Sequence, residues 1–155
     1  MTDEIAARLA GQDIVLPKPA APIAAYVPTV QVGNLLHISG QLPFKGEEIM
    51  TGRLGDDRDV AFGYEAARLC GIMLLAQINQ ALGSLHQVER VVKLGVFVNS
   101  AAGFTDQPKV ANGASELMEQ VFGEAGRHAR SAVGVPTLPR GAAVEVDAVI
   151  AVKAG

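Results

Sequence analysis

The feature that most constrains this fold is a helical repeat over residues 60–82. Apolar and small residues recur there at steps of three and four: Val60, Tyr64, Ala67, Gly71, Leu74, Ile78 and Ala81. Asp57 or Asp59 can cap the start of the helix, and Gly83 ends it. At about 1.5 Å per residue, such a helix is roughly 35 Å long and can cross a whole sheet.

A second helix is predicted over residues 107–122, with Asp106 as its cap, Pro108 in the first turn and Gly123 as its stop. The segment between the two helices, residues 88–99, is rich in β-branched residues and ends in a nearly continuous apolar run. This composition predicts a strand.

Further elements are predicted towards the N-terminus. Residues 3–10 form a short amphipathic helix with Gly11 just beyond it, and a Pro/Ala-rich lead-in follows at 16–22. A β-hairpin turns at Gly33-Asn34. Residues 43–58 are predicted as a loop, with a short strand at 48–51.

The C-terminus offers strands at 131–137 and 143–152, which the turn Leu138–Gly141 is predicted to join as a hairpin. The expected fold class is α+β, with two long helices on one face of a mixed sheet. Residues 1–155 are expected to form a single domain with its core in 22–153. Because several strands are apolar on both faces, we expect a second copy of the chain to cover the other face.

Composition excludes several classes of protein. Of the 155 residues 49% are hydrophobic and 19% charged, which is incompatible with intrinsic disorder. A net charge of −3 argues against nucleic acid as a partner. No run reaches the about 18–20 apolar residues of a membrane span, and the acidic N-terminus lacks the features of a signal peptide. A cytoplasmic location is therefore expected, with no membrane partner.

Strand alternation places Glu145 and Asp147 on one face, opposite a row of apolar residues. A carboxylate bracketed by valines on a central strand is costly unless it is paired or functional. The residues alone leave both open for Glu145: a structural ion pair and a catalytic role.

Arg130 is the candidate for binding a carboxylate, because a guanidinium can do so with two parallel hydrogen bonds. The alternative is a surface arginine paired with an acid such as Glu145. His128 is interpreted as a packed or exposed histidine, and His37 and His86 as structural. Cys70, within the long helix, is interpreted as a buried and inert thiol.

Glycine at position 40 permits either close approach of a ligand or a bulge. The small residues 112–115 within the second helix can face a ligand or allow close helix packing, and the sequence does not separate these readings. Phosphate-binding, dinucleotide, metal and nucleophile-elbow motifs do not occur, so no cofactor and no metal are expected.

Taken together, these segments resemble the family of YjgF-type reactive-intermediate deaminases (RidA, also called endoribonuclease L-PSP). Within that family, the chain resembles a branch with longer chains. The similarity covers roughly residues 22–153. The matching segments follow the family's order: Tyr26-Val27, Ile38–Pro43, Val96–Val98, Ala129–Val133, Leu138-Pro139 and Val144–Ala148. The signature of the longer-chain branch is 112–115 together with 128–131.

The resemblance implies a chorismate-mutase-like fold and a homotrimer with a central β-barrel and clefts between subunits. It implies hydrolysis of 2-imino or enamine acids, without a cofactor, to 2-keto acids and ammonia. Arg130 would bind the carboxylate of a small substrate, and Glu145 would position or activate water. Backbone contact would come from Gly40 and from Ala132, which replaces the family's usual Cys, and Tyr26 would reach the cleft from the neighbouring subunit.

The resemblance also implies that either Asn112 or Ser115 supplies the small polar residue of the cleft. Two alternative functions are considered. The protein could be a non-catalytic trimer that binds small carboxylates or a regulatory ligand, or it could be an endoribonuclease or translation inhibitor. Few aromatic residues (5%) and a negative charge offer neither a stacking surface nor a basic groove for RNA.

Overall fold

The structure is a computed structural model that describes residues 3–19, 21–22 and 24–154. Residue 20 of the predicted lead-in and the ends of the predicted domain, 1–2 and 155, lie outside the described residues. The helices are α1 (Glu4–Gly11), α2 (Val60–Leu82) and α3 (Gln107–Phe122), with short 3-10 turns η1 (Leu85–Gln87), η2 (Gly123–Gly126) and η3 (Pro139–Gly141). The strands are β1 (Thr29–Val32), β2 (Leu35–Gln41), β3 (Phe44–Lys45), β4 (Glu48–Ile49), β5 (Val88–Asn99), β6 (Ala129–Val135) and β7 (Val144–Val152).

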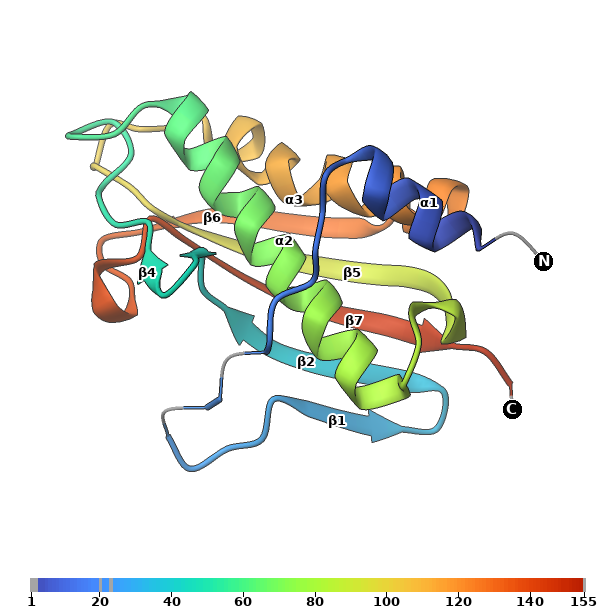
Figure 1. The fold of residues 1–155 in the computed structure, drawn as a ribbon. Coiled ribbons are helices and arrows are strands. Elements are labelled where there is room, and N and C mark those ends of the chain that lie inside the picture. Colours follow the sequence, from blue (N-terminus) through green and yellow to red (C-terminus); the bar gives the residue numbers. More distant parts are fainter. Residues whose placement is uncertain (1–2, 20, 23, 155) are drawn as a thin grey trace.

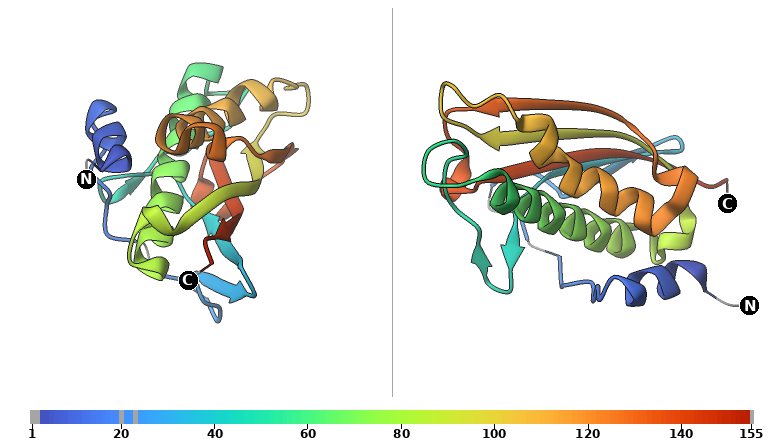
Figure 2. Two further views of the ribbon diagram at one scale, coloured as in Figure 1. Left: turned by 90° about the vertical axis from the view of Figure 1, so that its right-hand side faces the viewer. Right: turned by 90° about the horizontal axis from the view of Figure 1, so that it is seen from above.

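A mixed five-stranded sheet forms one layer and the long helices form the other. The strand order is β1-β2-β7-β5-β6, in which only β5 and β6 run parallel. Helices α2 and α3 lie side by side across one face of this sheet (Figures 1 and 2), and α1 packs against α3. Strands β3 and β4 form a separate small hairpin within the predicted loop. The α+β arrangement predicted from the sequence is confirmed.

Local signals set the ends of α2 as predicted. The Asp59 side chain accepts a hydrogen bond from the backbone N–H of Phe62 (2.9 Å), and Gly83 ends the helix at φ 80°. For α3 the predicted cap residue, Asp106, is confirmed as the N-cap. Its side chain makes no capping hydrogen bond, and its carboxylate instead pairs with the Lys109 ammonium at 3.6 Å.

The predicted C-terminal hairpin is also wrong. Strand β5 lies between β6 and β7, so these two strands do not pair. At its end, the N–H of Asn99 donates to the carbonyl of Ala143, while the N–H of Ser100 donates to that of Val135. The turn at η3 therefore carries the chain across the end of β5. This crossing places the largely buried β7 in the middle of the sheet, where both of its edges are paired.

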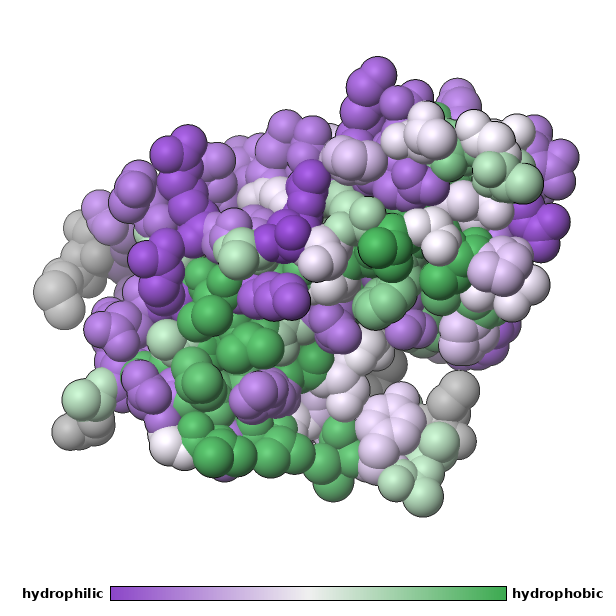
Figure 3. All heavy atoms as spheres, turned by 180° about the vertical axis from the view of Figure 1, so that it is seen from behind, coloured by the Kyte–Doolittle hydropathy of each residue, from purple (hydrophilic) through white to green (hydrophobic). Residues whose placement is uncertain are grey.

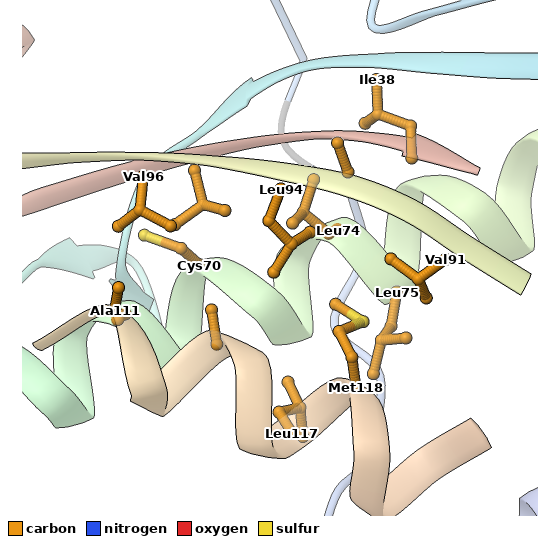
Figure 4. Close-up of a cluster of buried hydrophobic side chains, with 14 of the residues drawn as sticks. Ile38, Cys70, Leu74, Leu75, Val91, Leu94, Val96, Ala111, Leu117 and Met118 are labelled. Carbon is orange, nitrogen blue, oxygen red and sulfur yellow. The ribbon is translucent and has the colours of Figure 1, made fainter. Parts of the chain in front are cut away.

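The core lies between the sheet and the two long helices (Figure 4). A Cβ on Gly71 would meet Leu117 Cδ2 at 2.7 Å, so this glycine allows α2 and α3 to pack closely, as expected. Cys70 is fully buried among apolar side chains, and burial raises the pKa of its thiol. Among the described residues, no helix has both the length and the apolar character required to cross a membrane.

None of the helices in the described part of the chain lies on the opposite face of the sheet (Figure 2). Apolar residues spread across this face when the molecule is seen from behind (Figure 3). They include Val30, Val32 and Val133, whose exposed fractions are 49%, 66% and 46%. By register, Val30 and Val32 face the same way as their partners His37 and Leu35. The apolar character of this face agrees with the expectation from the sequence that several strands are apolar on both sides. Its coverage by a second copy of the chain stays a prediction.

Candidate functional site

Arg130 lies on the edge strand β6, at the helix side of the sheet. It pairs in register with Leu94, whose side chain is buried beneath the helices. Its Nη1 donates hydrogen bonds to Oδ1 of Asn112 (2.8 Å) and to Oγ of Ser115 (3.1 Å), both on α3. The two hydrogens of Nη1 are thus occupied. Within the described residues, Nε and Nη2 donate no hydrogen bond, which leaves one edge of the guanidinium able to bind a carboxylate with two bonds.

His128 fixes the hydroxyl of Ser115. Its Nδ1 lies 2.7 Å from the carbonyl oxygen of Gly126, which can only accept, so Nδ1 carries the hydrogen. In the neutral ring Nε2 is then an acceptor, and Ser115 Oγ lies 2.8 Å from it. The Ser115 hydroxyl therefore donates to His128 and accepts from Arg130. Burial, together with the charge of Arg130, lowers the pKa of His128, which favours this neutral form.

These residues line one cavity, which we call the arginine cavity. Its volume is about 350 Å³, and its lining is Asn112, Ser115, Glu116, Glu119, Gly126, Arg127, His128 and Arg130. Of the two readings left open for the segment 112–115, close helix packing is confirmed, while Asn112 and Ser115 line the arginine cavity and their contact with a ligand stays a prediction. Gly113 and Ala114 are buried against α2, where a Cβ on Gly113 would clash with the backbone carbonyl of Tyr64, while Asn112 and Ser115 face Arg130.

Glu145 is half-buried on β7, next to Gly40. Strand β2 changes register between Ile38 and Gln41, which agrees with the bulge proposed for this glycine. The neighbour that approaches it is the Glu145 side chain, and the approach of a ligand stays a prediction. A Cβ on Gly40 would meet Oε2 of Glu145 at 2.6 Å. In the described part of the chain, the Glu145 carboxylate has no ion pair and no hydrogen bond, so the structural ion pair considered for it is absent. Burial and the nearby Asp147 raise its pKa.

Glu145 lines a second cavity, which we call the glutamate cavity. Its volume is about 260 Å³. Its lining combines apolar and polar residues from the N-terminal segment, β2, α2 and the turn before β7: Ala21, Pro22, Ala24, Tyr26, Pro28, Gly40, Gln41, Leu42, Phe44, Gln77, Pro139, Arg140 and Glu145. Tyr26, Gly40 and Glu145, three of the predicted site residues, therefore come together here.

The predicted site residues are thus divided between two cavities. Glu145 pairs in register with Phe97, whereas Arg130 pairs with Leu94, three residues away on the same strand. Because side chains alternate along a strand, Arg130 and Glu145 project from opposite faces of the sheet. Arg130 is bonded to side chains of α3, and the alternative of an Arg130–Glu145 surface pair is wrong. Within one chain, the two groups do not face a common ligand.

The remaining candidates occupy simpler positions. Ala132 lies two residues beyond Arg130 and packs against the core. His86 forms an ion-pair contact with Asp3, at 2.7 Å from Nε2 to Oδ1. His37 lines a shallow hollow on the open face together with Asp147. Within the described ranges, no three His, Cys, Asp or Glu side chains come together in a way that could hold a metal ion.

Several residues of the glutamate cavity were not singled out from the sequence, among them Phe44, Gln77 and Arg140. Of these three, Arg140 alone could have been suspected from the sequence, because it precedes Gly141 in the predicted turn next to the strand that contains Glu145. Phe44 reaches the cavity from β3 and Gln77 from α2, and no spacing in the sequence connects them to Glu145. The bond between His128 and Ser115 joins residues 13 apart and was likewise missed.

Comparison with known proteins shows which family the chain resembles. Residues 6–150 match the family described as "YjgF/chorismate_mutase-like, putative endoribonuclease". The chain is 54% identical to Protein TCP17 of Trypanosoma cruzi over 148 residues, which span 94% of this chain and 92% of that protein. It is 30% identical to the 2-iminobutanoate/2-iminopropanoate deaminase of Dermatophagoides farinae over 142 residues, covering 90% and 95%.

Among solved structures, the Agrobacterium tumefaciens protein Atu1372 superimposes with a TM-score of 0.92 at 46% identity. That superposition covers 97% of this chain and 94% of the other. The mixed sheet with its two long helices is accordingly the chorismate-mutase-like fold. With a match across most of its length, the chain belongs to the YjgF/RidA/L-PSP family.

Proposed function

We propose that this protein hydrolyses 2-imino acids, or the enamines in equilibrium with them, to 2-keto acids and ammonia. The observation that carries the proposal is that two charged groups lack full bonding partners among the described residues: the Arg130 guanidinium keeps one open edge, and the half-buried Glu145 carboxylate has neither an ion pair nor a hydrogen bond. The similarity to a 2-iminobutanoate/2-iminopropanoate deaminase supports the same chemistry.

The first role belongs to Arg130, which would bind the carboxylate of the substrate through Nε and Nη2. Asn112 and Ser115 hold the opposite nitrogen, so the guanidinium has little freedom to rotate. A fixed carboxylate would set the position of the neighbouring imine carbon. Positioning of this kind supplies a large part of the rate gain when the uncatalysed reaction is already easy.

The second role belongs to Glu145, which would accept a proton from water as the oxygen adds to the protonated imine carbon. The product of that step is a carbinolamine. The proton would then return to the amine nitrogen, and the hydroxyl proton would leave with the departing ammonia. The result is one 2-keto acid and one ammonium ion per imine and water consumed. Burial raises the pKa of Glu145 and makes it a stronger base than an exposed glutamate.

The separation of these groups leads us to propose that the working site lies between two copies of the chain. Arg130 of one copy would meet Glu145, Tyr26 and Gly40 of the next. The uncovered apolar face of the sheet supports the same assembly, and we propose a homotrimer whose three sheets form a central barrel. The mass in solution, measured by light scattering, tests this part independently of activity.

The test of the activity is a coupled assay. An amino-acid oxidase generates 2-imino acids in place, and release of the keto acid is followed for the wild type, Arg130→Ala and Glu145→Gln. We expect the wild type to accelerate release and both variants to lose that acceleration. No acceleration by the wild type, with several imino acids, would contradict the proposal and favour a carboxylate-binding protein without catalysis.

Endoribonuclease activity, which the family description includes, finds less support in the site. The arginine cavity is lined by Arg127 and Arg130 but also by Glu116 and Glu119, and Arg127 is paired with Glu119 at 3.4 Å. The lining therefore has no excess of positive charge to attract a phosphodiester backbone.

A further inference from the structure

Arg140 holds an unusual backbone conformation in the glutamate cavity. Its φ of 60° and ψ of 17° lie in the left-handed region, which residues other than glycine rarely adopt because the side chain is crowded there. Arg140 and Asp13 are the two described residues other than glycine with positive φ. A conformation of this kind persists when surrounding structure enforces it, and it often occurs where a side chain is aimed at a ligand.

The Arg140 side chain is not explained by contacts within the chain. Its guanidinium lies over the Phe44 ring, 5.8 Å from the centroid. Across the described residues, it forms no ion pair and donates no hydrogen bond. It does not neutralise Glu145 either. A guanidinium in contact would lower the pKa of that carboxyl, whereas burial and Asp147 raise it. Within the described residues, the two groups thus form no ion pair with each other.

We propose that Arg140 binds a second acidic group of the ligand, so that the preferred substrates are 2-imino acids with a terminal carboxylate. This inference rests on the proposed function, because it assigns a substrate class to the same site. The 2-carboxylate would lie on Arg130 of the neighbouring copy, and the terminal carboxylate on Arg140. The methylene groups between them would contact the apolar walls formed by Tyr26, Pro28 and Phe44.

Electrostatics favour this class over neutral side chains. An arginine and a carboxylate can form two parallel charge-assisted hydrogen bonds, which are stronger than bonds between neutral groups. The Phe44 ring would keep the guanidinium in place while its edge remains open. A neutral chain of the same length would leave Arg140 without this partner, and a cationic chain would be repelled by it.

The experiment compares two keto-acid products of equal chain length by isothermal titration calorimetry on the full protein. The ligands are 2-oxoglutarate and 2-oxopentanoate, which differ in the terminal carboxylate. The variant is Arg140→Asn, since asparagine tolerates the left-handed conformation. The control is Arg58→Asn, which removes a different arginine lying over a phenylalanine, with its guanidinium 4.1 Å from the Phe62 centroid and outside the glutamate cavity.

We expect the wild type and Arg58→Asn to bind 2-oxoglutarate roughly tenfold more tightly than 2-oxopentanoate. In Arg140→Asn this preference should disappear through weaker binding of 2-oxoglutarate, while 2-oxopentanoate binds as before. Equal affinity of the wild type for both ligands, or a preference that survives in Arg140→Asn, would overturn the role of Arg140 and leave the carboxylate site intact. Binding of neither ligand would overturn the proposed function together with this inference.

Discussion

Gly40 and Glu145 approach each other so closely that a Cβ at position 40 would lie 2.6 Å from Oε2 of the carboxylate. The contact crosses from β2 to β7 at the point where the register of β2 changes. Because the atom in the way is the end of a side chain, any larger residue at position 40 would move the carboxylate and leave the backbone in place.

Gly40→Ala should therefore lower kcat while the protein remains folded. A displacement of the proposed base of about 1 Å can cost roughly 100-fold in rate. Steady-state kinetics and a thermal unfolding curve measure the two effects together. Gly103→Ala is the matched control, since a Cβ there would have no neighbour within 4 Å. Unchanged kcat in Gly40→Ala would argue against Glu145 as the base.

Asn112→Ala should weaken substrate binding and also lower kcat, because the guanidinium that positions the imine carbon loses one of the two bonds that hold it. The substitution removes the 2.8 Å bond that holds Nη1 of Arg130, and it leaves Glu145 untouched. A hydrogen bond to a charged group contributes about 1.5–3 kcal/mol, so KM should rise by roughly tenfold or more. The measurement is KM and kcat in the coupled assay, with the affinity for 2-oxobutanoate as a second readout. A fall in kcat at unchanged KM would contradict this role.

The fall of kcat/KM at low pH should reflect the raised pKa of Glu145. A base must be ionised to act, so activity should fall as pH drops through a value above the 4.5 of an ordinary glutamate. Asp147→Asn removes one of the two causes of that shift and should move the fall of kcat/KM to lower pH. If kcat/KM of Asp147→Asn falls at the same pH as in the wild type, the group that titrates is not Glu145.

His128 should contribute to stability above neutral pH and cease to do so in acid. Its pKa in the folded protein is lowered from 6.5, so the unfolded chain takes up the proton more readily. Stability should thus decline as pH falls below about 6.5. His128→Gln removes this contribution and should flatten the decline of Tm between about pH 8 and about pH 5.5, at one protein concentration.

Elements set by neighbouring residues were predictable from the sequence. The bounds of α2 follow from Asp59 at one end and Gly83 at the other. The extent of β5 follows from its continuous run of apolar and β-branched residues. Strand order was not predictable in the same way. The turn at 138–141 suggested a hairpin, yet β5 lies between the two strands, and that pairing depends on contacts remote in sequence.

The same limit applies to the site. Arg130 and Glu145 could be named from their residue types and from family resemblance, but their placement on opposite faces depends on the register of β5 against β6 and β7. The bond from Ser115 to His128 depends on how α3 packs beside β6. Arg140 was passed over because its side chain enters the cavity through a left-handed turn that sequence pattern does not specify.

The most direct test of the account is complementation between two inactive variants. Arg130→Ala retains Glu145, and Glu145→Gln retains Arg130, so subunits of both kinds must be mixed by co-expression or by refolding together. If each site takes Arg130 from one copy and Glu145 from the next, random mixing in equal amounts restores about one quarter of the wild-type activity. A mixture as inactive as either variant alone, with mixed assembly verified by mass spectrometry, would contradict a site shared between copies.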